Sequence, residues 1–538
     1  MGFIFDPDAK CEALAELGNI LLQTKKDMES SLPFAMDPVV FDYRVNEHGT
    51  VAELCNADDA TGAIQVRQQI MRMNASRETE SAVNGHKSLS TDNDLDNLLR
   101  EQQFDMQGHE HIRSDLQSGT IGLAKNRLST KSKLADVTAD DVIIIDEDSV
   151  SSDTCERGLE ALASGSVGVV SLAAGVGSRW TQGAGVVKAL NPYCCIGSKH
   201  QTFLDVHLAK NRKVSAKCGM PLPHVFTTSW MTDAPITSYV ESLDQNNNPP
   251  IYISRGKSTG LRMIPMVRDL TFLWQEQSHQ RLDEQAQKVR DSVQSALMGW
   301  AESNGEGSDY RDNVPKQCLS PIGHWYEVPN LLLNGTLEKM LQQRPQLKTL
   351  MLHNIDTIGA DVDAAILGKF LETGSTLAYE VVPRCIDDMG GGLCRVDGKP
   401  RLVEGLALPS EDDELKFSYY NSLTTWIDID KLLSKFGLER DDLDNSEKIS
   451  HAVNTFARRL PTYVTIKDVK KRWGNGQEDV HPVAQYEKLW GDMSSVEGVD
   501  CSYFVVSRNR GQQLKDPAQL DGWSRDGSAA YLDSICSW

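Results

Sequence analysis

The distribution of apolar residues changes character near Gly165. Downstream of that residue, short apolar runs follow one another at intervals, and these are VGVVSL, HVFTTS, PIYIS, KTLMLHNID and LAYEVV. Amphipathic stretches with helical periodicity lie between several of the runs, for example RLDEQAQKVRDSVQSALMGWA and NGTLEKMLQQ. Continuous apolar strands separated by helices are typical of a buried parallel sheet. The pattern therefore predicts an α/β fold with helices on both faces of the sheet.

The region upstream of Gly165 reads differently. EALAELGNILLQTKKDM and ATGAIQVRQQIMRM have helical periodicity, whereas NASRETESAVNGHKSLSTDNDLDN is polar and is expected to form a loop. We expect a mainly helical accessory region over residues 1–165 and a catalytic domain over residues 166–538. Within that domain, residues from about 436 to 538 are expected to form a closing subdomain.

Composition narrows the class of protein. The chain has 538 residues, 40% of them hydrophobic, and a formal net charge of −21. This charge argues against a nucleic-acid or membrane-surface binder, because phosphate backbones require a basic surface, but a small anionic ligand needs only a local basic pocket. The N-terminal segment has no long apolar run, and the eleven cysteines show no zinc-ligand spacing. We expect a cytoplasmic protein with reduced thiols.

The candidate chemistry begins directly after the first apolar run. The stretch SLAAGVGSRWTQGAGVVKALNP is rich in glycine and carries Arg179 and Lys188. Glycines let a backbone approach a ligand closely, and the two cations can face phosphate groups. Neither GxxxxGK[ST] nor GxGxxG is present. The stretch is either a phosphate-binding loop of another kind or a structural glycine turn.

This stretch resembles the signature loop of sugar-nucleotide pyrophosphorylases. Eight further segments resemble, in order, motifs of the UTP–glucose-1-phosphate uridylyltransferases and UDP-sugar pyrophosphorylases: HVFTTSWMTD, SPIGHWYEVP, MLHNIDTIGADVD, GGGLCRVDGKPRLVEGLALP, YYNSLTTWIDI, PTYVTIKDV, HPVAQYEKLWGDM and VVSRNRGQQLKD. The resemblance covers roughly residues 165–516. It implies a Rossmann-like, GT-A-like nucleotidyltransferase fold with a mixed, mostly parallel sheet. It also implies Mg²⁺-assisted, in-line attack of a sugar 1-phosphate on the α-phosphorus of UTP, giving a UDP-sugar and pyrophosphate.

The resemblance assigns roles to individual residues. Arg179, Lys188 and Lys467 would be catalytic cations that face the phosphates, and Asp356 would hold Mg²⁺. The residues it assigns to the nucleotide are Ala173, Ala174, Gly175, Gly177, Gly323 and His324. The residues it assigns to the sugar phosphate are Asp356, Gly391, Glu404, Asn421 and Lys515. Simpler explanations stay open for four of them: a packed histidine at 324, a turn cap at 356, a solvated strand charge at 404 and a surface lysine at 515.

Several positions depart from the family pattern. Arg255 stands where the family usually has a uracil-reading glutamine, and Trp325-Tyr326-Glu327 replaces the Gly-Asp after Gly-His. Leu423-Thr424 replaces an Asn pair on the sugar side. We expect no C-terminal β-helix module, and hence a monomer or weak oligomer. UDP-glucose is the expected product; a different nucleotide or sugar, such as N-acetylglucosamine 1-phosphate, and a weakly active nucleotide-sugar-binding scaffold are the alternatives.

Overall fold

The structure of the protein is a computed structural model. The structure describes residues 9–27, 92–146, 149–177, 180, 187–196, 199–244, 247–257, 259–276, 284–386, 388, 390–472 and 478–538. No helix among these residues is long and apolar enough to cross a membrane.

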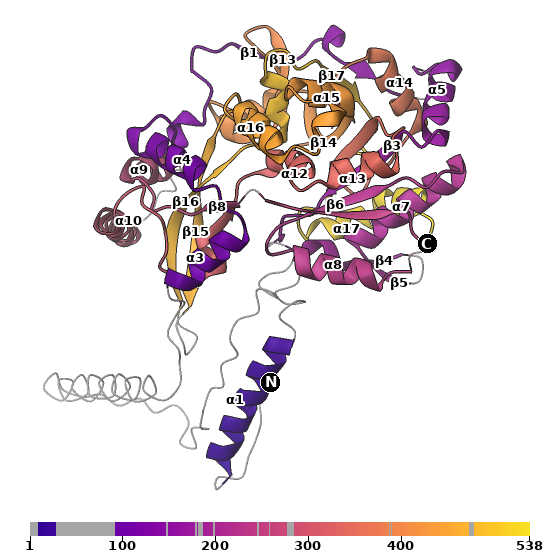
Figure 1. Cartoon of the computed structure of the whole chain (residues 1–538). Helices are drawn as coiled ribbons and strands as arrows, with labels where there is room; N and C mark the ends of the chain where they lie inside the picture. Colours follow the sequence, from indigo (N-terminus) through magenta and orange to yellow (C-terminus); the bar gives the residue numbers. More distant parts are fainter. Residues whose placement is uncertain are drawn as a thin grey trace, which may run out of the picture.

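A large mixed sheet organises the described chain (Figure 1). Its main path runs through eight strands in the order β2 (Ile143–Ile144), β17 (Cys501–Val505), β11 (Leu377–Pro383), β14 (Tyr419–Asp428), β10 (Thr349–Asn354), β3 (Val167–Leu172), β6 (His224–Thr228) and β7 (Ile251–Arg255). All neighbouring pairs on this path are parallel except those that β14 makes with β10 and β11. The five apolar runs of the sequence form β3, β6, β7, β10 and β11, so the predicted mixed, mostly parallel α/β sheet is confirmed.

Helices cover both faces of this sheet. Successive side chains of a strand point to opposite faces, so each strand contributes to a core on either side. On β3, Val170 packs into a core with α12 (Glu327–Leu333), α13 (Thr336–Gln343), α15 (Ile429–Lys435) and α16 (Ser446–Ala457). Its neighbour Val169 packs on the other face with α5 (Ser152–Ala163), α7 (Phe203–Cys218) and α14 (Ala364–Thr373). Strands that are buried on both sides explain why they read as continuous apolar runs.

Smaller elements surround the sheet. A hairpin of β12 (Gly392–Val396) and β13 (Lys399–Val403) extends it beside β14, and β1 (Leu134–Ala135) pairs with β12. Three further two-stranded sheets are β4 (Pro192–Ile196) with β5 (Lys199–Thr202), β8 (Thr259–Leu261) with β9 (Leu319–Pro321), and β15 (Tyr463–Arg472) with β16 (Glu478–Glu487). The remaining α-helices of the described residues are α1 (Lys10–Asp27), α3 (Asp92–Glu101), α4 (Met106–Ser118), α8 (Asp233–Ser242), α9 (Val267–Glu276), α10 (Glu284–Asn304), α11 (Pro315–Cys318), α17 (Gln519–Trp523) and α18 (Ser528–Ile535). Figure 1 shows α3, α4, α9 and α10 gathered around the β15–β16 hairpin, on the opposite side of the molecule from α5 and α14.

The upstream region contains helices and also joins the sheet. Helix α1 coincides with the first periodic stretch, whereas ATGAIQVRQQIMRM lies outside the described residues. The end of the expected polar loop is helical instead, because Leu95 and Leu99 of α3 are one turn apart and pack against Leu261 and Cys318. The boundary expected at residue 165 stays a prediction. Strands β1 and β2 and helix α5, all upstream of it, nevertheless pack with elements downstream.

The closing subdomain expected over residues 436–538 also stays a prediction. Its segment contributes β17 to the central sheet, next to β11, while β15 and β16 form a sheet of their own.

Candidate functional site

The carboxyl ends of the parallel strands meet at one edge of the sheet, and most of the predicted site residues follow them. Ala173 comes directly after β3 and Asp356 comes two residues after β10. Because β14 runs antiparallel to β10, it begins at this same edge, and Asn421 lies near its start. The segment after β17, which carries Lys515, leaves from this edge too. Ligands in open α/β sheets bind at such an edge.

The loop after β3 is fixed to β6 by its first two residues. The Ala173 N–H donates to the Thr227 hydroxyl at 3.0 Å, and the Ser229 hydroxyl donates to the Ala174 carbonyl at 2.8 Å. The Thr227 hydroxyl in turn donates to the carboxyl group of Glu327. Burial raises the pKa of Glu327 to about 7, although hydrogen bonds from Thr227 and from the Ala174 backbone oppose the shift.

Two glycines of this loop have different surroundings. Gly177 has a φ of +72°, and a Cβ at that position would overlap the side chain of Lys188. The Lys188 N–H donates to the Val176 carbonyl at 2.9 Å, which closes the loop on itself. Gly175 is exposed and has open space around its Cα. Glycine at 177 therefore allows Lys188 to pack against the backbone, while Gly175 keeps the loop accessible. Arg179 lies outside the described residues.

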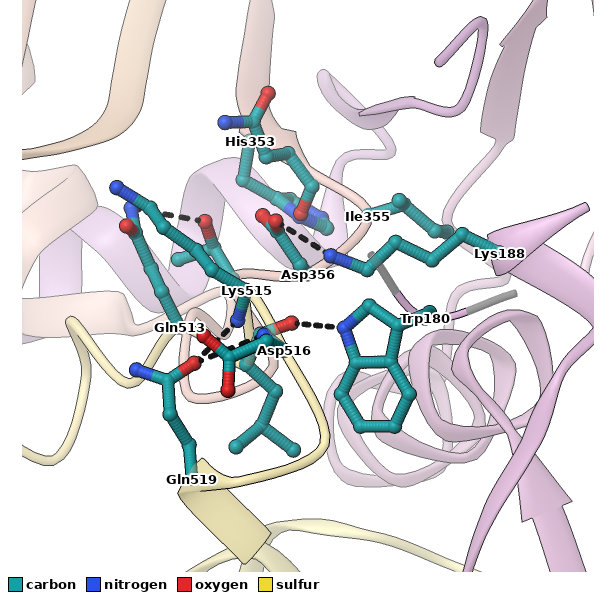
Figure 2. A network of polar contacts seen from close by, with 12 residues as sticks. Trp180, Lys188, His353, Ile355, Asp356, Gln513, Lys515, Asp516 and Gln519 are labelled. Carbon is teal, nitrogen blue, oxygen red and sulfur yellow. Dashed lines mark hydrogen bonds and ion pairs between the residues drawn. The ribbon is translucent and has the colours of Figure 1, made fainter. Parts of the chain in front are cut away.

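An ion pair joins this loop to the turn after β10. The Lys188 ammonium lies 2.7 Å from Asp356 Oδ2, and the two side chains are only 7% and 16% exposed (Figure 2). The ammonium also faces the rings of Phe203 and Trp180, at 5.2 Å and 5.8 Å from their centroids. Asp356 Oδ1 is buried and has no hydrogen-bond partner among the described residues. A buried charge of this kind needs a counter-ion, and removal of one partner typically lowers the stability of the folded protein by about 3–5 kcal/mol.

Asp356 is also the strongest candidate for a metal ligand. In the described part of the chain no cluster of three or more His, Cys, Asp or Glu residues could hold a metal ion. Mg²⁺ does not need such a cage, because it is usually bound by one or two carboxylates together with substrate phosphates and water. The unpartnered Oδ1 of Asp356 fits this donor set.

Among the residues predicted for the sugar phosphate, a carboxyl group lies between two glycines. A Cβ on Gly391 would lie 3.2 Å from Glu404 Oε2, and a Cβ on Gly491 would lie 2.6 Å from Glu404 Oε1. We call the space between these two glycines, which the Glu404 carboxyl group occupies, the Glu404 slot. Burial, with the neighbouring Asp492 adding to it and Lys515 opposing it, raises the pKa of Glu404 to about 8. Asn421 is buried beside the slot, and its Oδ1 accepts a 2.9 Å hydrogen bond from the N–H of Leu423, which has a φ of +64°.

The predicted nucleoside segment packs against the end of β16. Gly323 has a φ of +93°, and a Cβ there would overlap the Lys488 backbone. The His324 Nδ1 accepts a 3.2 Å hydrogen bond from the Trp490 N–H, and burial lowers the pKa of the imidazole to about 4. His324 is therefore a neutral, hydrogen-bonded ring, as in the simpler of the two explanations; its contact with a nucleoside stays a prediction.

Two predicted cations have different positions. Lys515 is half-buried, and its ammonium donates to the hydroxyl of Tyr420 on β14, next to Asn421. Lys467 is exposed on β15, opposite Val483 of the separate β15–β16 sheet, and the structure does not bring it into the network around Asp356. Arg255 is 56% exposed and lies 3.7 Å from Asp233, so it is directed to the surface of α8.

Sequence reasoning missed several residues of this site. The Leu514 N–H donates to the carbonyl of the predicted residue Asp356, while Trp180 donates to the Leu514 carbonyl and Gln513 to the Ser422 carbonyl. Glu327 and Asp492 are buried carboxyl groups beside the loop and the sugar slot. Such contacts have no sequence pattern, although Glu327 occupies a position that departs from the family motif.

A groove in the described part of the chain lies elsewhere. It has a volume of about 1140 Å³ and lies between α4 and α16. Its lining contains none of the predicted site residues, and we assign the candidate site to the sheet edge, where most of those residues lie.

Comparison with known proteins finds a family to which part of the chain is similar. Residues 302–469 match the model of the UTP–glucose-1-phosphate uridylyltransferase family. Over that segment, the chain is similar to this family. The segment contains Gly323, His324, Asp356, Glu404 and Lys467, but it ends before Lys515 and begins after the glycine-rich loop.

Similar proteins carry the same name. The chain is 30% identical over 166 residues to the UTP–glucose-1-phosphate uridylyltransferase of Saccharomyces cerevisiae, covering 27% of this chain and 33% of the yeast protein. It is 28% identical over 138 residues to that of Hordeum vulgare, covering 24% and 29%. The chain thus matches about a third of the length of these relatives. A crystal structure of a UDP-glucose pyrophosphorylase mutant from Leishmania major is similar over 80% of this chain and 78% of that one, with 17% identity and a TM-score of 0.51, and so shares the fold.

Proposed function

We propose that the protein is a nucleotidyltransferase that makes UDP-glucose and pyrophosphate from UTP and glucose 1-phosphate. The observation that carries this proposal is the buried Lys188–Asp356 pair at the carboxyl edge of the sheet, between the glycine-rich loop and the Glu404 slot. The family match over residues 302–469, and the names of the relatives that share it, support UTP and glucose 1-phosphate over the alternative substrates.

In the proposed reaction a phosphate oxygen of glucose 1-phosphate attacks the α-phosphorus of UTP. A new P–O bond forms, the bond between the α-phosphorus and the bridging oxygen breaks, and pyrophosphate leaves with the electron pair. No covalent enzyme intermediate is needed, so catalysis depends on positioning and on charge stabilisation.

The residues of the site divide these tasks. Lys188 places a partly desolvated positive charge where the triphosphate would enter from the loop, and it would stabilise the departing pyrophosphate. Gly175 keeps the loop backbone open to phosphate oxygens, and Gly177 lets Lys188 pack against that backbone. Glu404, with Asn421 beside it, would accept hydrogen bonds from the sugar hydroxyls.

Asp356 would hold Mg²⁺ through its unpartnered Oδ1. When bound, the ion would neutralise phosphate charge that Lys188 alone cannot offset.

The test is pyrophosphate release by the purified protein with glucose 1-phosphate and each of UTP, TTP, ATP, CTP and GTP, in Mg²⁺ and in EDTA. We expect release with UTP in Mg²⁺ and none in EDTA. Preference for another nucleotide would show that this protein selects a base other than uracil. A folded protein that is silent with all five nucleotides would refute the proposal.

A further inference from the structure

The segment of residues 512–516 connects the two halves of the candidate site (Figure 2). Its central residue, Leu514, is 2% exposed, and both of its backbone polar groups bond to the site. The Leu514 N–H donates to the Asp356 carbonyl at 3.0 Å, and the Leu514 carbonyl accepts from the Trp180 indole N–H at 2.8 Å. One buried residue therefore links the turn after β10 to the glycine-rich loop.

Trp180 contacts both sides of this link. Its N–H bonds to Leu514, while the face of its ring lies toward the Lys188 ammonium. The ring is held by Phe203 and Tyr193, with centroid distances of 5.1 Å and 6.0 Å in edge arrangements. Since the tryptophan is only 7% exposed, its orientation is fixed by this aromatic cluster.

The other end of the segment is anchored on the sugar side. Gln513 donates to the Ser422 carbonyl at 2.8 Å and accepts from the Tyr420 hydroxyl at 3.2 Å, both on β14. Leu514 thus lies between an anchor on β14 and the indole of Trp180. The hydrogen bond from the Trp180 indole to the Leu514 carbonyl joins the glycine-rich loop to this segment.

We propose that Trp180 is a positioning residue, whose indole N–H holds Leu514 and, through Leu514, keeps the Asp356 turn in register with Lys188. The inference rests on the proposed uridylyltransferase function for its catalytic consequence. Its structural content, the coupling of the loop to the turn, is independent of the substrate.

The chain offers a matched pair of substitutions. Trp180→Phe removes the indole N–H but keeps an aromatic ring in the cluster and near Lys188. Trp523→Phe also removes an indole N–H that donates to residues 512–516, because the Trp523 indole donates to Gln512 Oε1 at 2.8 Å. Trp523 also packs against Tyr193, with ring centroids 6.2 Å apart, so the two variants disturb one aromatic cluster. Of these two tryptophans, Trp180 belongs to the glycine-rich loop and Trp523 does not.

The kinetic experiment compares UDP-glucose formation by the two variants. A neutral hydrogen bond contributes about 0.5–1.5 kcal/mol, so Trp180→Phe should lower kcat by roughly three- to tenfold. The KM values for UTP and glucose 1-phosphate should change less than about twofold, because the variant shifts the reacting groups rather than removing a ligand contact. Trp523→Phe should keep kcat within about twofold of wild type. Equal kcat values for Trp180→Phe and wild type, or an equal loss in both variants, would overturn the proposal.

The second experiment does not need activity. Hydrogen–deuterium exchange of Trp180→Phe should be faster in peptides that cover residues 353–360 as well as 512–516. In Trp523→Phe, exchange should rise in the 512–516 peptide alone. Unchanged exchange over 353–360 in Trp180→Phe would overturn the inference. If the wild-type protein made no UDP-glucose, the proposed function would fail while this exchange pattern still decided the coupling.

Discussion

The proposed phosphate side and the proposed sugar side of the site differ in how their charged groups are paired. On the phosphate side, Lys188 and Asp356 form a buried pair of opposite charges 2.7 Å apart. On the sugar side, Glu404 has a neighbouring carboxyl, Asp492, and burial raises the pKa of Asp492 to about 7. Glu404 Oε1 and Asp492 Oδ2 are both buried without hydrogen-bond partners among the described residues. One side therefore contains an ion pair, with one further acceptor at Asp356 Oδ1, whereas the other contains two neighbouring carboxyl groups, each with an unpartnered oxygen.

This difference matches the chemistry proposed for each side. Phosphate transfer needs fixed charges that do not reorganise as the reaction proceeds. Sugar recognition needs acceptors that become satisfied only when hydroxyl donors arrive, since a buried polar group without a partner is costly. The glycines follow the same division, because Gly177 lets a cation pack and Gly391 and Gly491 make room for a carboxyl.

The largest expected effect comes from breaking the charge pair on the phosphate side. Lys188→Ala should lower kcat by about 10²–10³-fold, because the departing pyrophosphate loses its positive partner. Lys199→Ala, at an exposed position on β5, is the matched control. The double variant Lys188→Ala/Asp356→Asn removes the buried unpaired carboxylate that could unfold the single variant. Recovery of wild-type kcat in the double variant would contradict a direct role for Lys188.

The next effect tests Asp356 without changing its size. Asp356→Asn should lower activity by roughly 10²-fold and raise the Mg²⁺ concentration needed for half-maximal rate, because a neutral amide is a weaker ligand for a hard cation. Asp363→Asn is the control, since Asp363 caps α14 and asparagine caps a helix about as well. An unchanged Mg²⁺ titration for Asp356→Asn would show that the ion is held elsewhere.

A smaller effect is expected from filling the space beside Lys188. Gly177→Ala combines a positive φ with a clash against Lys188, and strain of this kind costs on the order of 1–3 kcal/mol. Gly175→Ala has neither problem and should retain wild-type stability. Chemical denaturation measures both. Equal stability of the two variants would mean that the loop adjusts and that the Lys188 packing does not depend on Gly177.

The smallest effect concerns the pH dependence of stability on the sugar side. The pKa of Glu404 is about 8 in the folded protein and ordinarily 4.5, so between these values the folded state keeps a proton that the unfolded state has released. The contribution of Glu404 to stability is therefore full below pH 4.5 and is lost as pH rises to about 8. Glu404→Gln lacks this loss, so its Tm should rise by a few degrees relative to wild type between pH 5 and pH 8. A Tm difference that is constant with pH would contradict the raised pKa.

Much of the fold could be predicted because strands buried on both faces leave continuous apolar runs. The direction of β14 could not, since the apolar pattern of YYNSLTTWIDI is the same for a strand running either way. The helical end of the expected polar loop was not predicted, because the segment is mostly polar and its helix depends on the packing of Leu95 and Leu99.

The candidate site, too, is only partly predictable from the sequence. Lys188, Asp356, Gly391 and Glu404 were predicted from motif order, and the structure places Lys188 beside Asp356 and Gly391 beside Glu404, while their roles stay predictions. Leu514 could not be predicted, because it acts through its backbone, and nothing in the sequence shows that a carbonyl receives the Trp180 indole.

The most direct test of the account is exchange of labelled pyrophosphate into UTP, measured with and without glucose 1-phosphate. Direct in-line attack at one composite site predicts Mg²⁺-dependent exchange that requires glucose 1-phosphate and is lost in Lys188→Ala. Exchange with UTP alone would reveal a covalent uridylyl-enzyme and contradict the mechanism, and no exchange under any condition would contradict the proposed function itself.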